Sequence, residues 1–269
     1  MSDKSEILKR EEDFHDEWAG TIDPQEVKVD ESFTGSTSPE GAWIIEQLGD
    51  LKGKKVLELG SGAGEGAVFM AKQGADVTAT DLSSGMLEVV KKVAALHGVS
   101  VKTAVASADD LSQFGNESFD VVYAANLLHH VDIARCLDAV KAVLKPGGTA
   151  AFWDPVAHNP AINVYRRMAM DVRTPDEHPI RRADMKLFRE RFSGLNYKFF
   201  WLASLLVFVR FWLVDRIHPS ADRYWKLIIT RERELRPMVS KLMWLDKMIL
   251  KVVPFLGWWC WNIAIIVRK

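Results

Sequence analysis

The chain is poor in cysteine and has almost no net charge, and both features exclude certain classes of function. Two of its 269 residues are cysteines, Cys136 and Cys260, and their wide separation fits neither a disulfide framework nor a thiolate metal site. The formal net charge of −1 gives no general basic field that would attract nucleic acid. We therefore expect a protein of a reducing compartment that does not bind nucleic acid.

The sequence also lacks a hydrophobic run of transmembrane length. The charged N-terminal residues MSDKSEILKREEDF contain no apolar core of a secretory signal. The most apolar stretch, residues 199–214, has Arg210 as its single charge and is shorter than the roughly 20 residues that span a bilayer. These absences predict a cytoplasmic protein without a membrane-spanning helix.

Charge and tryptophan are distributed unevenly along the chain. The first 60 residues carry 15 acidic against 7 basic side chains, whereas residues 205–258 carry 10 basic against 5 acidic ones. Seven of the ten tryptophans lie at or after Trp201. We therefore expect the acidic N-terminal part and the basic, tryptophan-rich C-terminal part to have different roles.

Short apolar runs alternate with segments of helical spacing in the first half of the chain. We expect strands at residues 55–59, 76–80, 99–106, 119–124 and 149–153, helices at 65–73, 85–97 and 133–144, and two final strands at 196–202 and 261–268. This alternation predicts an α/β fold with a doubly wound, Rossmann-like, mostly parallel seven-stranded sheet.

A glycine loop follows the first expected strand, with Gly60, Gly62 and Gly64 in the run VLELGSGAGEG. Glycines let a ligand approach the backbone closely because no Cβ intervenes. The dinucleotide fingerprint G-x-G-x-x-G/A fails when counted from Gly60, since its sixth position is Glu65, and matches only when counted from Gly62. Nicotinamide dinucleotide binding therefore stays a weaker alternative.

Two acidic residues accompany this loop. Glu58 lies two residues before it, where a carboxylate suits a cationic ligand better than a diphosphate. Asp81 lies 21 residues after Gly60, at the end of the second expected strand, where a carboxylate can accept both hydroxyls of a ribose. The pattern favours a nucleoside with a ribose, a positive charge and no diphosphate, and S-adenosylmethionine fits that description.

Six segments resemble, in order, the motifs of class I S-adenosylmethionine-dependent methyltransferases. They are VLELGSGAG at 56–64, DLSSGML at 81–87, ADDL at 108–111, SFDVV at 118–122, LHHV at 128–131 and LKPGG at 144–148. They cover roughly residues 54–154 and look most like the small-molecule and quinone C-methyltransferase branch. Ser107 departs from the pattern, because the family often has an acid there that contacts the adenine.

The resemblance implies a role for each motif. The glycine loop would line the methionine part of the cofactor and Asp81 would hold the ribose. Neighbouring apolar residues would contact the adenine, and the residues after the fourth strand would border the amine and the sulfonium. The implied cofactor-binding residues are Glu58, Gly60, Ser61, Gly62, Gly64, Asp81, Leu82, Met86, Ala108, Asp109, Asn126 and Leu127.

Methyl transfer from a sulfonium is an in-line displacement that depends mainly on alignment in a dry pocket. A base is needed only if the acceptor's proton must leave early. We expect such a base among His130, just past the fourth expected strand, Tyr165, and His178 in the polar segment 173–182, with His129 as a weaker candidate. No close group of acids and histidines indicates a metal site, so none is predicted.

A basic, tryptophan-rich stretch separates the last two expected strands. Residues 205–214 are almost wholly apolar, and residues 238–253 show the spacing of an amphipathic helix. Basic amphipathic segments with aromatic anchors are typical of peripheral attachment, here to the inner face of a membrane. A lid over a lipophilic substrate, an oligomer contact and core packing are the alternatives.

These expectations combine into one organisation: cofactor-covering helices at 1–50, a methyltransferase core at 51–204 with a substrate-side segment at 155–192, an apolar basic insertion at 205–258 and a terminal strand at 259–269. The predicted function is methyl transfer from S-adenosylmethionine to a small, lipophilic or membrane-resident acceptor, such as a lipid, an isoprenoid quinone or a hydrophobic natural product. The alternatives are a non-catalytic cofactor-binding or membrane scaffold and a nicotinamide-dependent oxidoreductase. The acceptor atom and the oligomeric state stay open.

Overall fold

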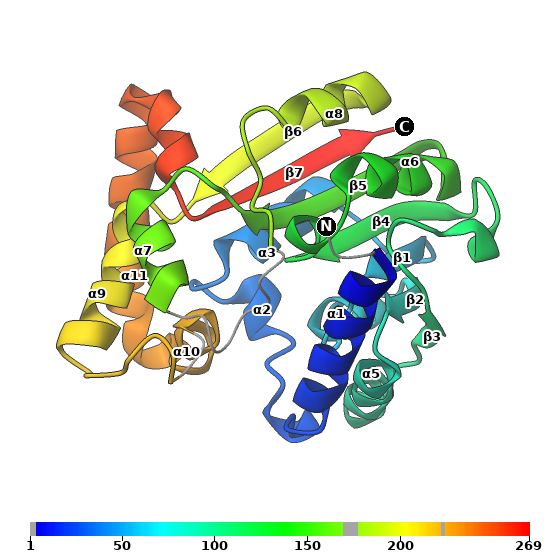
Figure 1. Cartoon of the computed structure of the whole chain (residues 1–269), viewed down its shortest axis with the longest axis horizontal. Coiled ribbons are helices and arrows are strands. Elements are labelled where there is room, and N and C mark those ends of the chain that lie inside the picture. Colours follow the sequence, from blue (N-terminus) through cyan, green and yellow to red (C-terminus); the bar gives the residue numbers. More distant parts are fainter. Residues whose placement is uncertain (1–3, 169–176, 222–223) are drawn as a thin grey trace.

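The computed structural model describes residues 4–168, 177–221 and 224–269, and in these the chain forms one seven-stranded sheet between layers of helices (Figure 1). The strand order is β3-β2-β1-β4-β5-β7-β6. Neighbouring strands are parallel except β7, which runs antiparallel to both β5 and β6. The predicted doubly wound, mostly parallel sheet is confirmed.

The strands follow the apolar runs of the sequence. In chain order they are β1 (Lys55–Leu59), β2 (Asp76–Asp81), β3 (Lys102–Val105), β4 (Phe119–Ala125), β5 (Leu144–Pro155), β6 (Ser193–Phe200) and β7 (Asn262–Arg268). The fifth strand begins earlier than residue 149 because Leu144 pairs with Phe119 across an irregularity in the ladder. The third strand is shorter than the expected range 99–106.

Helices pack on both faces of the sheet, each through its apolar side. One face carries α3 (Pro39–Leu48), α4 (Glu65–Lys72) and α5 (Ser84–Leu96), and the other carries α6 (Ile133–Val143) and α8 (Met185–Arg191). The remaining α-helices are α1 (Lys4–Ala19), α2 (Glu31–Thr34), α7 (Pro160–Met168), α9 (Leu206–Leu213), α10 (Tyr224–Thr230) and α11 (Glu232–Val252). The expected helices of the core are therefore present within a residue or two of their predicted ends.

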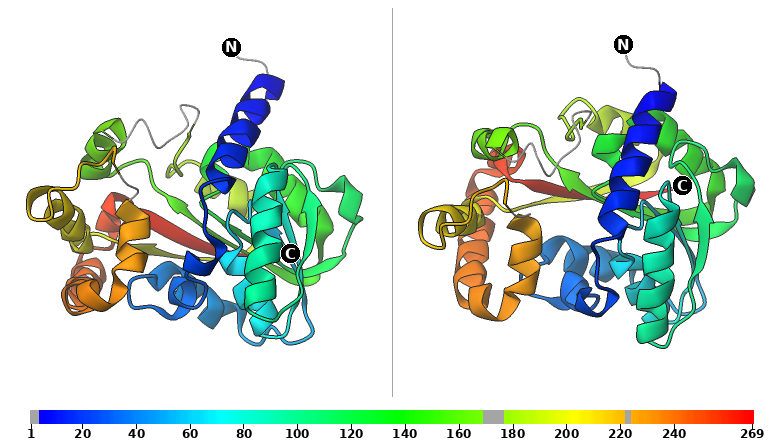
Figure 2. Two further views of the ribbon diagram at one scale, coloured as in Figure 1. Left: turned by 90° about the horizontal axis from the view of Figure 1, so that it is seen from below. Right: turned by 60° about the horizontal axis from the view of Figure 1, so that its bottom comes forward.

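The N-terminal helix α1 lies alongside α5 (Figure 2). Asp16 Oδ1 accepts hydrogen bonds from the backbone N–H of Gly85 at 3.0 Å and from Ser83 Oγ at 2.5 Å. Ser83 Oγ in turn accepts from the N–H of Met86, which caps the start of α5. A Cβ at Gly85 would lie 3.0 Å from Asp16 Oδ1, so the glycine makes room for this close approach.

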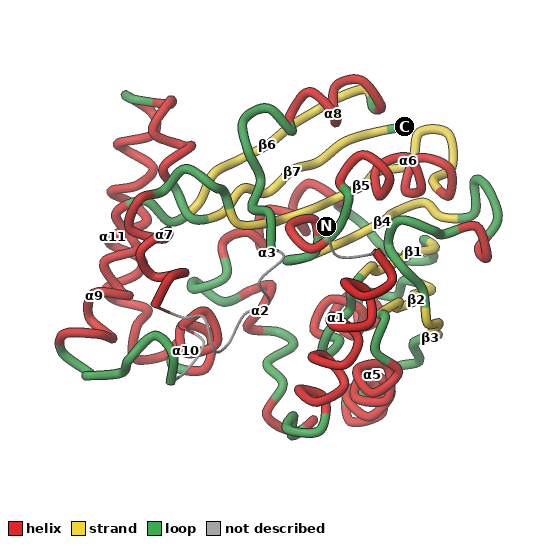
Figure 3. Tube along the Cα trace, viewed as in Figure 1, coloured by secondary structure: helices red, strands yellow, loops and turns green. Residues whose placement is uncertain are grey.

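The insertion (residues 205–258) forms a group of helices between β6 and β7, at the end of the molecule where α9 and α11 lie (Figures 1 and 3). Asp246 on α11 is buried and accepts hydrogen bonds from the backbone N–H groups of Leu202, Ala203 and Ser204. This carboxylate ties α11 to the chain that leaves β6. Every helix in the three described ranges is too short or too polar to span a bilayer.

Candidate cofactor and acceptor site

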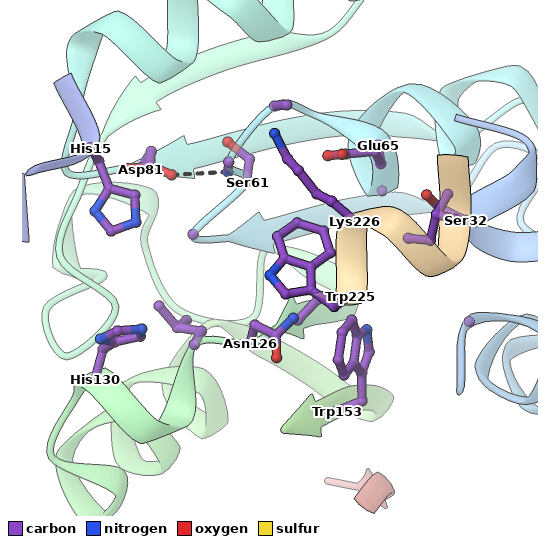
Figure 4. A pocket seen from close by; sticks show the side chains of 18 of the residues that line it. His15, Ser32, Ser61, Glu65, Asp81, Asn126, His130, Trp153, Trp225 and Lys226 are labelled. Carbon is purple, nitrogen blue, oxygen red and sulfur yellow. Dashed lines mark hydrogen bonds between the residues drawn. The ribbon is translucent and has the colours of Figure 1, made fainter. Parts of the chain in front are cut away.

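A cavity of about 590 Å³ opens at the carboxyl ends of the parallel strands. The strand order reverses between β1 and β4, and ligands of open α/β sheets bind at this switch point. Figure 4 shows the cavity between α1, the glycine loop and α10. Its wall contains residues from the N-terminal helices, the core and the insertion.

The glycine loop needs each of its three glycines, since Gly60, Gly62 and Gly64 all have positive φ (60°, 50° and 90°). A Cβ at Gly60 would lie 2.8 Å from Leu127 Cδ1, and one at Gly64 would lie 3.0 Å from Val90 Cγ2. At Gly62 a Cβ would meet nothing within 4 Å in the described chain. Gly60 and Gly64 thus allow close packing, while Gly62 leaves open space above the loop.

Asp81, at the end of β2, is held by two backbone N–H groups. Its Oδ2 accepts from Gly62 and its Oδ1 from Ser83, both at 3.0 Å. Burial raises the pKa of Asp81, while Ser83 and the nearby His15 of α1 act in the opposite direction. Because each carboxylate oxygen can accept two hydrogen bonds, Asp81 keeps capacity for the hydroxyls of a ribose.

Glu58 is buried beneath the start of α4. A Cβ at Gly66 would overlap its Oε1, so the glycine is what admits the carboxylate. Burial, with the nearby Glu65, raises the pKa of Glu58. Glu58 Oε2 and Ser61 Oγ are buried without a hydrogen-bond partner in the described residues. Orphaned polar atoms and a carboxylate under an open loop fit a cationic nucleoside.

Glu65 also lines the cavity, at the N-terminus of α4. A dinucleotide's pyrophosphate would lie against that helix end. A carboxylate there repels such a diphosphate, so the structure does not favour the nicotinamide alternative.

Most of the predicted cofactor-binding residues meet at this cavity. Those in its wall are Glu58, Gly60, Ser61, Gly62, Asp81, Leu82, Ala108, Asn126 and Leu127. Gly64, Met86 and Asp109 are not in the wall: Met86 is fully buried, and Asp109 lines a separate pocket. Ser107, which departs from the family pattern, donates a hydrogen bond from its Oγ to Asp109 Oδ1 at 2.6 Å.

Two histidines reach the cavity from η3 (Leu128–His130), which follows β4. His129 Nδ1 lies 2.6 Å from Asp154 Oδ1, a separation that requires a hydrogen between the two atoms. The same oxygen accepts the backbone N–H of His129 at 3.2 Å, and burial raises the pKa of Asp154 to about 7. A buried carboxylate that orients an imidazole in this way leaves Nε2 as the ring atom that can take up a proton.

The structure places two of the three predicted catalytic residues at the cavity. The His130 ring lies beside that of His129, tilted by 40° with 4.1 Å between ring centres, and its Nδ1 lies 3.4 Å from Glu11 Oε1 of α1. Tyr165 of α7 lines the wall. His178 is exposed and outside the wall, and only its backbone N–H reaches the site, where it donates to the carbonyl of His129 at 2.6 Å. Residues 173–176 of its polar segment lie outside the described residues.

One group of side chains at this place can hold a divalent cation. His129, His130 and Glu177 each offer one donor atom, and these atoms all lie within 4.8 Å of one another. Two imidazoles and a carboxylate are a common donor set for transition metals. The sequence predicts no metal site, because Glu177 is far from the histidines along the chain and only the fold brings it beside them.

The insertion contributes residues 225–230 of α10 to the wall, and the sequence assigns none of them to the site. Trp225 and Lys226 of α10 project into the cavity, and the ammonium of Lys226 extends toward Ser61 and Glu65 (Figure 4). Lys226 Nζ also lies 4.9 Å from the centre of the Trp18 ring of α1. Burial raises the pKa of Glu65, which Lys226 partly offsets. Helix α10 therefore connects the insertion to the glycine loop and to α1.

Comparison with known proteins identifies the family. Residues 57–152 match a family described as a methyltransferase domain. The ubiquinone biosynthesis O-methyltransferase of Acinetobacter baylyi is 31% identical over 185 residues, which cover 60% of this chain and 76% of that protein. The protein of the same name from Pseudomonas savastanoi pv. phaseolicola is 37% identical over 119 residues, 44% of this chain and 50% of that one.

A solved S-adenosylmethionine-dependent methyltransferase from Archaeoglobus fulgidus has the same fold. It aligns with a TM-score of 0.56 over 89% of this chain and 97% of its own, at 16% identity. The motif order, the cavity and a relative aligned over three-quarters of its length agree with one another. They show that the chain belongs to the class I S-adenosylmethionine-dependent methyltransferases, enzymes whose cofactor is S-adenosylmethionine.

Proposed function

We propose that this enzyme methylates a hydroxyl oxygen of a small lipophilic acceptor, such as an isoprenoid quinol or a lipid, that it takes up at a membrane surface. The observation that carries the proposal is that the insertion both lines the cavity and presents an apolar surface to the outside. Its helix α10 lines the cavity, while α9 and α11 expose large apolar side chains. Relatives named as ubiquinone biosynthesis O-methyltransferases support both the oxygen and the lipophilic acceptor.

S-adenosylmethionine supplies the methyl group from its sulfonium when bound. In this chain, Asp81 would hold the ribose and the glycine loop the methionine part, with Glu58 and Ser61 offering their orphaned oxygens from below. The aromatic side chains Trp153 and Trp225 would keep water from the reacting atoms. The same residues would thereby fix the direction of the in-line displacement.

His129 would act as the base and Asp154 as its positioning residue. As the acceptor oxygen forms its bond to the methyl carbon, its proton passes to Nε2 of the imidazole. The buried carboxylate of Asp154, 2.6 Å from Nδ1, stabilises the imidazolium that results. This assignment moves the base from His130, which the sequence favours, to the neighbour that has a carboxylate partner.

The acceptor's lipophilic character is supported by the cavity wall and by the outer surface. The wall beyond the cofactor residues is aromatic: it includes Trp153, Tyr165, Trp201, Trp225 and Trp261. On α11, Trp244, Met248 and Val252 follow one another at four-residue intervals and are exposed, so they share one helix face. Lys247 and Lys251 are exposed next to them, which suits an anionic membrane surface.

A transfer assay tests this function. The purified enzyme is incubated with methyl-tritiated S-adenosylmethionine and a detergent-dispersed lipid extract, and label in the organic phase is counted. We expect organic-phase label that S-adenosylhomocysteine suppresses and that a His129→Gln variant forms at least about a hundredfold more slowly. Label confined to water-soluble products would show that the acceptor is not lipophilic, although the chain would remain a methyltransferase.

A further inference from the structure

The cavity extends well past the residues assigned to the cofactor. Asn262, the first residue of β7, lies opposite Pro155 of β5 and also lines the cavity. Strands β4 and β5 lie between β1 and β7, so three strand spacings, about 14 Å in all, separate this end from the glycine loop. The polar residues in the wall there are Thr37, Ser38, Glu40 and Asn262.

Three of these side chains are buried with unmet hydrogen-bonding capacity. Thr37, Ser38 and Asn262 are 3%, 8% and 3% exposed. Thr37 Oγ1, Ser38 Oγ and Asn262 Oδ1 have no hydrogen-bond partner in the described part of the chain. Burying a polar atom without a partner costs free energy, so such a cluster beside a cavity indicates a missing ligand.

The fourth residue, Glu40, fixes the orientation of the cluster. Glu40 Oε1 accepts from Asn262 Nδ2 at 2.7 Å, and the indole N–H of Trp201 donates to the same carboxyl group. With its nitrogen held by Glu40, the Asn262 amide has its oxygen left for another donor. Trp201 has a φ of +69°, a strained conformation for a tryptophan that must be held by its surroundings. The side chains of the cluster are therefore held in place by specific hydrogen bonds and not by loose packing.

The donors and acceptors define the chemistry of the group that fits. Asn262 Oδ1 needs a hydrogen-bond donor, whereas the hydroxyl hydrogens of Thr37 and Ser38 need an acceptor. A hydroxyl group provides both at one atom. An ammonium has no lone pair for the two hydroxyl hydrogens, and the carboxyl group of Glu40 disfavours a phosphate or carboxylate.

This polar cluster is separate from the proposed base. Side chains alternate along a strand, and Trp153 packs in the core on the α3 side of β5, so Asp154 faces the other side. Along β7, Ala264 and Ile266 pack in that same α3-side core, which places Asn262 with Trp153 and not with Asp154. A group bound at Asn262 therefore differs from the oxygen that reacts at His129.

We propose that Thr37, Ser38 and Asn262 form a subsite for a second, uncharged hydroxyl group of the acceptor, which anchors the molecule while another of its oxygens is methylated. The acceptor class is therefore a lipophilic molecule with at least two oxygen substituents. This inference rests on the proposed function, because it assumes that the far end of the cavity receives the acceptor.

The test compares matched probes on protein saturated with S-adenosylhomocysteine. The probes are 4-octylcatechol, octylbenzene, which lacks both oxygens, and 4-octylbenzylamine. Binding is followed by quenching of tryptophan fluorescence, since Trp201 and Trp261 lie in the wall. In the variant Thr37→Val/Ser38→Ala we expect at least tenfold weaker binding of the catechol, unchanged binding of octylbenzene, and S-adenosylhomocysteine affinity within twofold of wild type. Thr34→Val is the control, because Thr34 is exposed and its hydroxyl is already bonded to the carbonyl of Asp30.

Three results would overturn the subsite. They are a loss of S-adenosylhomocysteine affinity in the double variant, equal weakening of catechol and octylbenzene, and tightest binding of the amine by the wild type. The melting temperature should not fall in the double variant, since the removed hydroxyls have no partner to lose. Thr37→Val alone gives the same contrast should the double variant not fold. Failure of the proposed function would instead appear as wild-type enzyme that binds the catechol but labels no lipid.

Discussion

His129 Nδ1 lies 2.6 Å from Asp154 Oδ1, and this contact joins the end of β4 to the end of β5 at the mouth of the cavity. We predict that His129→Gln lowers kcat by roughly 10² to 10⁴, the range that a positioned base contributes. Steady-state kinetics of the variant and the wild type at one pH measure this loss. His97→Gln, at the exposed end of α5, is the control.

The affinity for S-adenosylhomocysteine should stay unchanged in His129→Gln, and calorimetry checks this. His129 could act as a base, or it could bind a cation together with His130 and Glu177. Dialysis against EDTA distinguishes these two roles. A base needs no metal, so activity should survive chelation. Activity that EDTA abolishes and a divalent cation restores would show that the imidazole serves as a ligand.

Asp81 provides a prediction about the cofactor alone. Its carboxylate accepts from Gly62 and Ser83 and would accept two ribose hydroxyls as well. Because hydrogen bonds to a charged group contribute about 1.5–3 kcal/mol each, Asp81→Ala should weaken S-adenosylhomocysteine binding by roughly 10²-fold or more in calorimetry. Asp76→Asn, at the exposed start of the same strand, should bind normally. Equal affinity of wild type and Asp81→Ala would remove the ribose assignment.

The sequence was sufficient for the sheet because each strand carries its own local signal. Alternation of apolar runs with helical spacing predicts all of the strands, and most of the motif residues between Glu58 and Leu127 lie in one cavity wall. The helix expected at 238–253 begins earlier, at Glu232, and contains Pro237 in its interior. A proline is normally found near the start of a helix. Here the helix starts earlier, at Glu232, whose side chain accepts hydrogen bonds from Ser36 and Arg236.

The acceptor side of the site could not be predicted in the same way, because its residues come from distant segments. Lys226 enters from the insertion, and Asn262 meets Glu40 across more than two hundred residues. Neither position has a local pattern that differs from an ordinary helix or strand. The sequence favours His130 over His129 for a similar reason, since Asp154, the partner of His129, lies 25 residues away and only the pairing of β4 with β5 brings it near.

Glu40 makes stability depend on pH. Burial raises its pKa from 4.5 to about 7, so the folded state holds a proton that the unfolded state releases between these values. The stability that the protonated Glu40 contributes to the folded state is fully present below about pH 4.5 and is lost as pH rises to about 7. Glu40→Gln should therefore gain stability relative to wild type over this range, by an amount on the order of 3 kcal/mol at pH 8.

Urea unfolding of both proteins between pH 4.5 and 8 measures that difference. Glu46→Gln is the matched control, because Glu46 is exposed on the same helix α3. Curves for wild type and Glu40→Gln that run parallel throughout would show that the carboxyl group does not titrate with the raised pKa.

The exposed apolar side chains of the insertion predict binding to anionic vesicles. Trp212 on α9 and Trp244 on α11 are 50% and 64% exposed, and a tryptophan that inserts at the interface transfers its apolar area out of water. Co-sedimentation with phosphatidylglycerol-containing liposomes should therefore fall at least tenfold in Trp212→Ser/Trp244→Ser, and should weaken with salt because Lys247 and Lys251 contribute through charge. Leu96→Ser, which removes a 57% exposed apolar residue from α5, should bind like wild type. Wild-type protein that stays in the supernatant at low salt, or equal loss in all variants, would leave the insertion as a wall of the cavity and not a membrane contact.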